Sequence, residues 1–269
     1  MGSGTSTKLI LWWSGRGFGE QLIIARVVSI LVDNGLDVIF REGYKVANLV
    51  DCRKIPHNDN KTLTGYQTYK WAYSIKDKNP IIVQYTKHYE DVFEKKIEIT
   101  NDCVPVVYYD IEVPRYDVIL HTSSGSWSIY RIWPYFNELE QLLDKNNITW
   151  IDIDNRKKHG RIGGVQYLNY VKKSKVYVGL DTGPSHYVSS IAKNKTLIIQ
   201  GGFITYDYWA YTYKFDHIQI DDVPCRPCFL NKNDISCGNV CQYNHRCMRE
   251  ISPQDVLNKI IQIMEKNNG

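Results

Sequence analysis

The sequence predicts an α/β protein built on parallel sheets. Two stretches carry this prediction, because residues 8–40 and 175–200 each alternate strand, helix and strand. Strands joined through a helix run parallel in one sheet. With 269 residues, the chain is long enough for two domains. Its 43% hydrophobic and 23% charged residues favour a sizeable core and argue against global disorder.

The first half opens with strand 8–13, a glycine-rich turn at 14–19, helix 20–34 and strand 37–40. Gly35 is a suitable stop for that helix. The helix is apolar over more than one stripe, so it should be largely buried. Further on, the composition favours helix 65–76, strand 80–85, helix 89–96 and strand 104–109. Pro114 breaks the pattern, so we expect one domain at 1–114 and a second at 115–269.

The second half repeats the alternation of strands and helices. The expected strands are 116–120, 149–153, 175–180 and 196–200, and the expected helices are 135–146, 164–173, 185–192 and 252–266. Strand 175–180 is short and valine-rich, as a buried strand should be.

The turn after residue 180 has the residues of an anion site. Asp181 and Thr182 can cap a helix, Gly183 permits a tight turn, and Pro184 suits the first helical position. Backbone N–H groups and the positive end of a helix dipole then lie beyond a strand, which suits a phosphate group. On these residues alone, a simple helix cap is an equal alternative.

The turn Gly15-Arg16-Gly17-Phe18-Gly19-Glu20 resembles a dinucleotide-binding turn but ends in glutamate. Glu42 could serve as the ribose-binding acid of such a fold. A carboxylate at the helix start would compete with a pyrophosphate for one dipole. A nicotinamide-dependent oxidoreductase therefore stays an alternative, as does a non-catalytic nucleotide-sugar-binding module.

Asp181-Thr182-Gly183-Pro184-Ser185-His186 resembles the D-T-G-x-x-H signature of glycosyltransferase family 9, the heptosyltransferase-like enzymes. Gly19-Glu20-Gln21-Leu22 is similar to the family's G-D-x-L segment, with glutamate in place of aspartate. The loop from His121 and the residues Arg131-Ile132-Trp133-Pro134 are similar to the opening of its second domain, although Thr122-Ser123 replaces proline and glycine.

The resemblance implies the GT-B fold, in which two Rossmann-like domains face each other across a cleft. It implies transfer of a sugar from a UDP-, ADP- or GDP-linked donor to an acceptor hydroxyl, with inversion and no catalytic divalent ion. Glu20 would be the general base, in an acceptor-side loop with Gly17, Phe18 and Gly19. The donor diphosphate would be held by Thr122, Ser123, Arg131, Asp181, Thr182, Gly183, Pro184, Ser185 and His186.

Five of the seven cysteines lie between residues 225 and 247. Their C-x2-C and C-x3-C spacings predict a structural four-thiolate site for zinc or iron. The expected ligands are Cys225, Cys228, Cys237 and Cys241, with Cys247 in reserve. This segment resembles the metal-binding loop of heptosyltransferase-like enzymes that glycosylate autotransporters. Disulfides are the alternative, and they would need an oxidising compartment.

The remaining expectations concern partners and location. A glycan, a protein side chain or a hydroxymethylated base of viral DNA could be the acceptor, and the net charge of +4 is compatible with each. The sequence has no apolar run long enough to span a membrane. Its polar first residues lack the features of a signal peptide. We therefore expect a cytoplasmic protein (host cytoplasm if viral), which could form a homo-oligomer.

Overall fold

The computed structural model describes residues 9–12, 17–41, 49–51, 67–70, 77–124, 131–160, 162–209, 211–228, 241 and 243–268. The chain divides into two compact units. One comprises Met1–Tyr108 with Asp207–Tyr213, and the other comprises Tyr109–Tyr206 with Lys214–Gly269. Residues 207–213 therefore belong to the first unit, although the chain on both sides of them belongs to the second.

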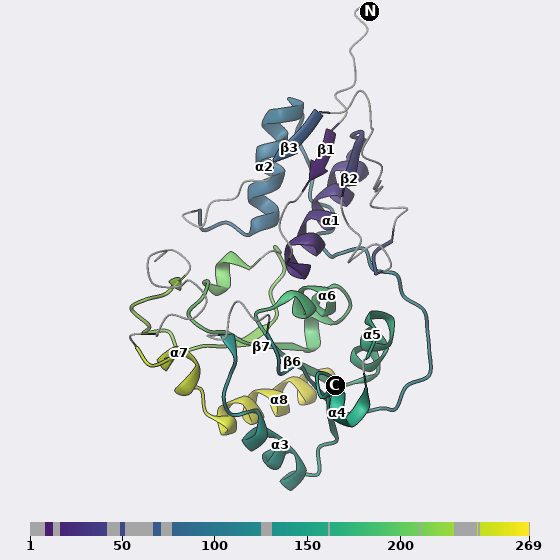
Figure 1. Cartoon of the computed structure of the whole chain (residues 1–269). Coiled ribbons are helices and arrows are strands. Elements are labelled where there is room, and N and C mark those ends of the chain that lie inside the picture. The colour runs from purple at the N-terminus through teal and green to yellow at the C-terminus, as the bar shows by residue number, and fades with distance from the viewer. Residues whose placement is uncertain are drawn as a thin grey trace, which may run out of the picture. The chain divides into compact units, whose positions relative to one another are not determined.

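The first unit contains a parallel three-stranded sheet in the order β2-β1-β3. Its strands are β1 (Leu9–Trp12), β2 (Val38–Arg41) and β3 (Gln67–Lys70), and its helices are α1 (Phe18–Asp33) and α2 (Ile81–Phe93) (Figure 1). Helix α1 is buried from Gly19 to Leu31 apart from Glu20, which confirms the burial predicted from its apolar sequence. Gly35 follows with a φ of 75°, as a helix stop requires.

Three predictions for the first half were wrong. Residues 67–70 form strand β3 and not part of a helix, and residues 71–76 lie outside the described residues. The expected strand at 80–85 is the start of α2, and the helix predicted at 89–96 is present as the end of α2, residues 89–93. Of the strand expected at 104–109, only Val106 pairs, in a single bridge to Val50.

The second unit contains a parallel five-stranded sheet in the order β5-β4-β6-β7-β8. The strands are β4 (Val118–Leu120), β5 (Trp150–Asp152), β6 (Val176–Leu180), β7 (Thr196–Ile199) and β8 (Asp216–Ile218). The chain runs from β4 to β5 on one side and then places β6 on the other side of β4. The carboxyl ends of β4 and β6 therefore meet at a topological switch point, where open α/β sheets bind ligands.

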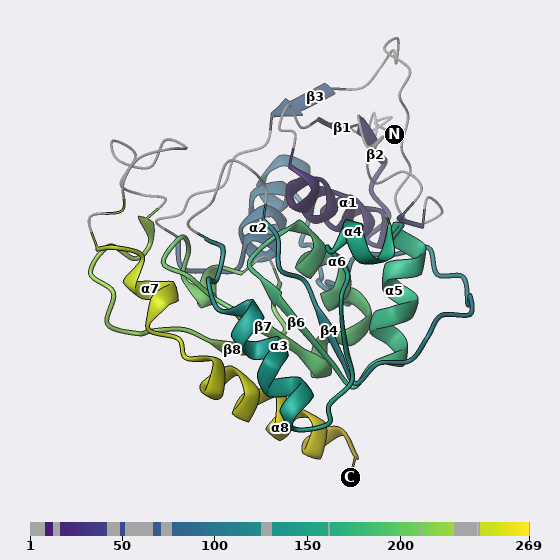
Figure 2. The same ribbon diagram turned by 60° about the horizontal axis from the view of Figure 1, so that its bottom comes forward.

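Helices cover both faces of this sheet (Figure 2). Helices α3 (Phe136–Lys145) and α8 (Pro253–Asn268) pack against the face formed by alternate residues such as Val118, Val176 and Val178. Helices α5 (Gly164–Lys173) and α6 (Gly183–Ala192) contact each other. Tyr177, from the alternate set of strand residues, hydrogen-bonds to both of them.

The buried indole of Trp133 donates its N–H to the carbonyl of Ile251, at 3.0 Å, and so ties the chain before α3 to the chain before α8. Short helices complete the second unit: α4 (Arg156–His159), η2 (Lys193–Lys195) and α7 (Arg246–Arg249). The short helix η3 (Tyr206–Tyr208) begins in the second unit and ends in the first. The helices and strands predicted between residues 116 and 200 are all present. Within the described ranges, no helix is both long and apolar enough to cross a membrane.

Candidate functional site

The loop Asp181–His186 lies at the carboxyl end of β6 and opens helix α6. Thr182 is the N-cap residue in extended backbone conformation, and Pro184 lies in the first turn, as the sequence predicts. The Thr182 side chain makes no capping hydrogen bond, so the capping role expected for that side chain was wrong. The N-cap residue therefore leaves the positive end of α6 without a cap from its own side chain, and this end can attract an anion.

A chain of buried hydroxyl groups supports this loop from below. Tyr167 donates to the phenol oxygen of Tyr177 at 3.0 Å, and that oxygen lies 3.1 Å from Oγ of Ser185. Ser185 donates in turn to the carbonyl of Leu180. A Cβ atom at Gly179 would lie 2.5 Å from the Tyr177 hydroxyl, so only glycine fits there. The Ser185 side chain is thus fully buried within the scaffold of the loop.

Arg131 brings a positive charge to the same place. Its Nη1 donates to the carbonyl of Asp181 at 2.6 Å, and its guanidinium lies 3.9 Å from the ring centroid of Phe203. Burial, together with the nearby Arg131 charge, lowers the pKa of His186 to about 3. His186 is therefore neutral at pH 7, and the positive charge of the site comes from Arg131 and the α6 dipole.

His121 joins the ends of three strands. It directly follows β4, and its ring is almost fully buried. Its Nδ1 lies 3.4 Å from Oγ1 of Thr182, beyond β6, and its Nε2 lies 3.4 Å from Oδ2 of Asp154, beyond β5. Burial lowers the His121 pKa, although the Asp154 carboxylate acts in the opposite direction.

The Thr122-Ser123 loop is held by carboxylates. Asp154 accepts the backbone N–H groups of Thr122 and Ser123 at 2.9 and 3.0 Å. The Thr122 hydroxyl lies 3.1 Å from the nearer carboxylate oxygen of Asp152 and donates to that group. Of the two hydroxyls expected at a phosphate, that of Thr122 is therefore already engaged, while Ser123 is exposed.

Asp152 and Asp154 are polar site residues that sequence reasoning missed. They lie at the carboxyl end of β5, where an acid commonly binds ribose hydroxyls in nucleotide-binding sheets. The sequence signal that could have indicated this role is the pair of aspartates at the end of a short strand. Burial raises the pKa of Asp152, and so does the charge of Asp154, although the hydrogen bond from the backbone N–H of Asp154 acts in the opposite direction. The acid weighed for a ribose role in the first half, Glu42, lies outside the described residues.

Glu20 lies in the first turn of α1, after the N-cap residue Gly17. A Cβ atom at Gly17 would lie 1.7 Å from Oε2 of Glu20, so the carboxylate folds back over the amino end of its own helix. Of the other residues expected in the acceptor-side loop, Gly17 precedes the helix, and Phe18 and Gly19 are its first two residues. The Glu20 carboxylate occupies the position that a pyrophosphate would need in a dinucleotide-binding turn.

Four of the clustered cysteines are described, and none of them forms a disulfide. Sγ of Cys225 and Sγ of Cys228 lie 3.7 Å apart. Burial, then Cys225, and then Cys247 and Cys241 raise the pKa of Cys228 to about 12. The reserve residue Cys247 therefore lies close enough to influence Cys228, while Cys237 lies outside the described residues. Among the residues that the structure describes, no three or more Cys, His, Asp or Glu side chains lie so that they could hold a metal ion together.

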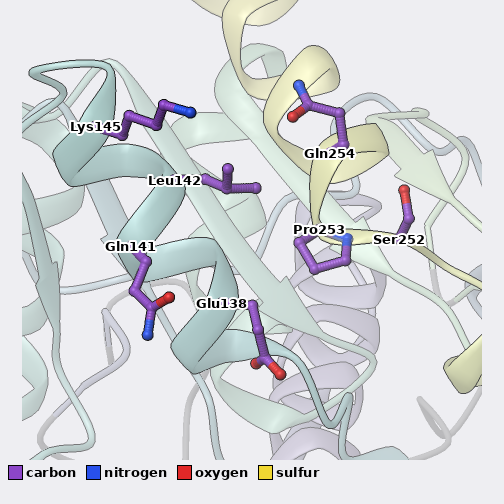
Figure 3. Close-up of a pocket in the computed structure, with 7 residues that line it drawn as sticks. All are labelled: Glu138, Gln141, Leu142, Lys145, Ser252, Pro253 and Gln254. Atoms are coloured by element: carbon purple, nitrogen blue, oxygen red, sulfur yellow. The ribbon is translucent and has the colours of Figure 1, made fainter.

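A separate cavity of about 460 Å³ lies between α3 and the start of α8 (Figure 3). Its lining residues are Glu138, Gln141, Leu142, Lys145, Ser252, Pro253 and Gln254. None of the predicted donor, base or cysteine residues lines it. Figure 3 shows Leu142 pointing between the two helices, so this cavity is a groove of the helix pair.

Comparison of the fold with solved structures gives several similar proteins. The iron-containing dodecameric glycosyltransferase TibC from enterotoxigenic E. coli H10407 has a TM-score of 0.68 at 16% identity, over 98% of this chain and 77% of TibC. TibC in complex with ADP-D-β-D-heptose gives 0.68 at 14% identity, over 97% and 77%. A family 9 glycosyl transferase from Veillonella parvula DSM 2008 gives 0.65 at 8% identity, over 97% of each chain.

The fold of this chain is similar to that of these glycosyltransferases. The prediction of an α/β class with parallel sheets is confirmed, whereas the arrangement of two domains across a cleft stays a prediction. The sequence itself matches no protein-family model and no curated protein. The likeness to heptosyltransferases is therefore one of fold.

Proposed function

We propose that this protein is a glycosyltransferase that uses a nucleotide-sugar donor. The observation that carries the proposal is Arg131, whose guanidinium lies against the carbonyl of Asp181 at the amino end of α6. A fixed guanidinium and a helix dipole at one point form a binding site for a diphosphate. The heptosyltransferase fold supports a sugar nucleotide as the source of that diphosphate.

The proposed donor is ADP-, UDP- or GDP-linked. One TibC structure contains ADP-D-β-D-heptose, so the ADP-linked sugar is the first to test. Asp152 and Asp154 are the residues that we expect to bind the ribose hydroxyls, because they lie at the carboxyl end of β5, the strand beside β4. Asp154 also fixes the backbone of the Thr122-Ser123 loop, so one residue would link nucleoside and diphosphate recognition.

The proposed reaction is a single displacement at the anomeric carbon. The acceptor oxygen bonds to this carbon on the face opposite the donor diphosphate, the bond to the diphosphate oxygen breaks, and its electron pair leaves with the diphosphate. Glu20 would take the acceptor proton, since its carboxylate makes no hydrogen bond or ion pair among the described residues. Arg131 and the α6 dipole would stabilise the charge on the leaving group without a divalent ion.

The acceptor could be a glycan, a protein side chain or a hydroxymethylated DNA base. Transfer to DNA would weaken steeply as salt is added, because phosphate contacts release counterions. Transfer to a glycan would change much less over the same range. We also propose a cytoplasmic protein, free to form a homo-oligomer.

We propose a structural zinc or iron ion at the cysteine cluster, and the distance between two of its sulfur atoms supports this. Four thiolates at about 2.3 Å around a tetrahedral ion lie about 3.8 Å from one another. The 3.7 Å between Cys225 and Cys228 agrees with this spacing. Burial raises the pKa of Cys247, and the positive charge of Arg226 acts in the opposite direction. We propose Cys225, Cys228 and Cys241 as ligands, with Cys237 or Cys247 as the fourth. Bound zinc or iron would crosslink this loop.

A panel of nucleotide-sugars and NAD, measured by thermal shift and calorimetry, tests the proposed function. A ligand present at 100 times its dissociation constant should stabilise the protein by about 2.7 kcal/mol. Arg131→Ala should remove most of the shift given by the cognate nucleotide-sugar. Stabilisation by NAD alone would favour an oxidoreductase, and binding without any transfer to a range of acceptors would favour a non-catalytic module.

A further inference from the structure

The loop after β7, residues 200–204, lies between the cysteine cluster and the donor site. The buried side chain of Gln200 donates to the carbonyl of Ile204 at 3.0 Å and closes the turn. Gly201 and Gly202 are buried, while Phe203 is half-buried. The turn places two successive residues, Gly202 and Phe203, against different neighbours.

The cysteine cluster holds the middle of this loop at Gly202. The Gly202 carbonyl accepts the backbone N–H of Cys228 at 2.8 Å, and the Gly202 N–H donates to the sulfur of Cys247, which lowers the Cys247 pKa against the effect of burial. A Cβ atom at Gly202 would lie 3.2 Å from Sγ of Cys228 and 3.5 Å from Sγ of Cys247. The two backbone polar groups of Gly202 therefore hydrogen-bond to two candidate metal ligands.

The next residue, Phe203, reaches the donor site. Its ring lies under the guanidinium of Arg131, with 3.9 Å between Cζ and the ring centroid. The guanidinium also donates from Nη1 to the carbonyl of Asp181 at 2.6 Å. These two contacts together restrict the position of the group that we assign to the diphosphate.

We propose that Phe203 is a positioning residue for Arg131, and that Cys228 and Cys247 hold Phe203 in place through Gly202. The inference rests on the proposed donor site. It predicts that the metal at the cysteines affects diphosphate affinity as well as stability, because the same loop connects the two places. Loss of the metal releases Gly202, Phe203 then leaves the guanidinium, and Arg131 loses its fixed orientation.

A double-mutant cycle tests the contact. ADP, UDP and GDP are titrated calorimetrically into the wild-type protein, Phe203→Leu, Arg131→Ala and the double variant, each checked for folding by circular dichroism. Phe203→Leu should weaken the binding of the preferred diphosphate by about 3- to 10-fold. In the Arg131→Ala background the same substitution should have almost no effect. Phe203→Tyr should retain wild-type affinity, and Tyr109→Leu, at an exposed aromatic of the same unit, is the matched control.

Metal removal tests the link to the cysteines. The purified protein is dialysed against a chelator, its metal content and circular dichroism are measured, and the diphosphate titration is repeated. Affinity should fall by a factor similar to that of Phe203→Leu, and Phe203→Leu itself should show no further fall. An unchanged affinity of the folded, metal-free protein would overturn the link. If the metal-free protein unfolds, Cys247→Ser, checked for folding and for retained metal, replaces it in the same titration. Its affinity should fall by a similar factor, and an unchanged affinity would overturn the link.

The outcomes separate this inference from the proposed function. If the wild-type protein binds no nucleoside diphosphate, the proposed donor site is wrong and the inference with it. If Arg131→Ala weakens binding but Phe203→Leu does not, the donor site stands and the inference is overturned. An equal effect of Phe203→Leu with and without Arg131 would also overturn it, because Phe203 would then act independently of the guanidinium.

Discussion

Arg131 and His186 show how single residues set the charge of the candidate donor site. His186 lies in the first turn of α6, but its low pKa keeps it neutral at pH 7. Arg131 stays charged at any pH at which the protein folds. The resemblance that assigned both residues to the donor gave no indication of this division of roles, which depends on burial.

Glu20 gives the sharpest test of the proposed chemistry. Glu20→Gln retains the shape of the side chain and removes its ability to accept a proton. Transfer should fall by about 100- to 10,000-fold, the usual contribution of a general base, while donor affinity stays the same. Initial rates and calorimetric donor titrations measure the two quantities separately.

Asp91→Asn is a matched control for this substitution, because Asp91 is an exposed acid on α2 of the same unit. It should leave transfer unchanged. Transfer by Glu20→Gln at the wild-type rate would remove Glu20 from the mechanism.

His186 also makes stability depend on pH. Its pKa is about 3 in the folded protein and about 6.5 in the unfolded chain, so the unfolded chain binds more protons between these values. The stabilisation is complete above pH 6.5 and is lost as the pH falls, by up to about 1.4 kcal/mol per pH unit. His186→Gln should flatten this slope in urea unfolding between pH 7 and pH 4.5. The same change at exposed His159 should leave the slope as it is.

The contacts of the site residues show what sequence cannot supply. Asp181–His186 was recognisable because its glycine, proline and capping residues follow one another in the chain. The donation of the Thr122 hydroxyl to Asp152 spans 30 residues, and the contact of Arg131 with Phe203 spans 72. Such pairs depend on which strands become neighbours, and no local pattern contains that information.

Secondary-structure elements were predictable where the pattern was long or bounded by turn residues. Helix α6 follows a valine-rich strand and a Gly-Pro turn, so its start was found to within two residues. The first part of helix α2 was missed because the apolar run after Pro80 is also typical of a strand. Its buried residues Ile81, Ile82, Tyr85, Thr86 and Tyr89 have helical spacing, a pattern that becomes clear only over the whole element.

The cysteine loop is an element whose stability should depend on an ion. Cys228→Ser should reduce the metal content from about one zinc or iron per chain to near zero and lower the melting temperature by at least about 5 °C. Elemental analysis and calorimetric melting measure both effects. Cys103→Ser is the control, because Cys103 belongs to the first unit and should affect neither. A wild-type protein that is stable and free of metal would contradict the site.

At the scale of the whole molecule, the chain passes from one unit to the other more than once. Residues 207–213 belong to the first unit and contain the buried side chains of Tyr208, Trp209 and Tyr211. Asp102 holds this segment, since Oδ2 accepts both the backbone N–H and, at 2.7 Å, the hydroxyl of Thr212. The sequence does not reveal that residues 207–213 belong to the first unit, because neither proline nor glycine marks the ends of this segment.

Asp102→Ala should therefore weaken the first unit. The substitution leaves the partly buried N–H of Thr212 without its acceptor, which costs about 1–3 kcal/mol. Denaturant unfolding followed by circular dichroism measures the loss. Asp102→Asn retains one carbonyl acceptor and should lose less, whereas equal losses in the two variants would show that the hydrogen bonds to Thr212 are not the cause.

The hydroxyl chain beneath the donor loop has a consequence for titration experiments. Burial raises the pKa of both Tyr167 and Tyr177, while it lowers the pKa of His121 and His186. Near neutrality Tyr167, Tyr177 and His186 each keep one protonation state, so these three groups add no inflection of their own to an affinity profile. A change in ADP affinity near pH 6 would then report the terminal phosphate of the ligand, whose second proton dissociates at about that pH. A sugar-capped diphosphate lacks that proton and should give a flat profile.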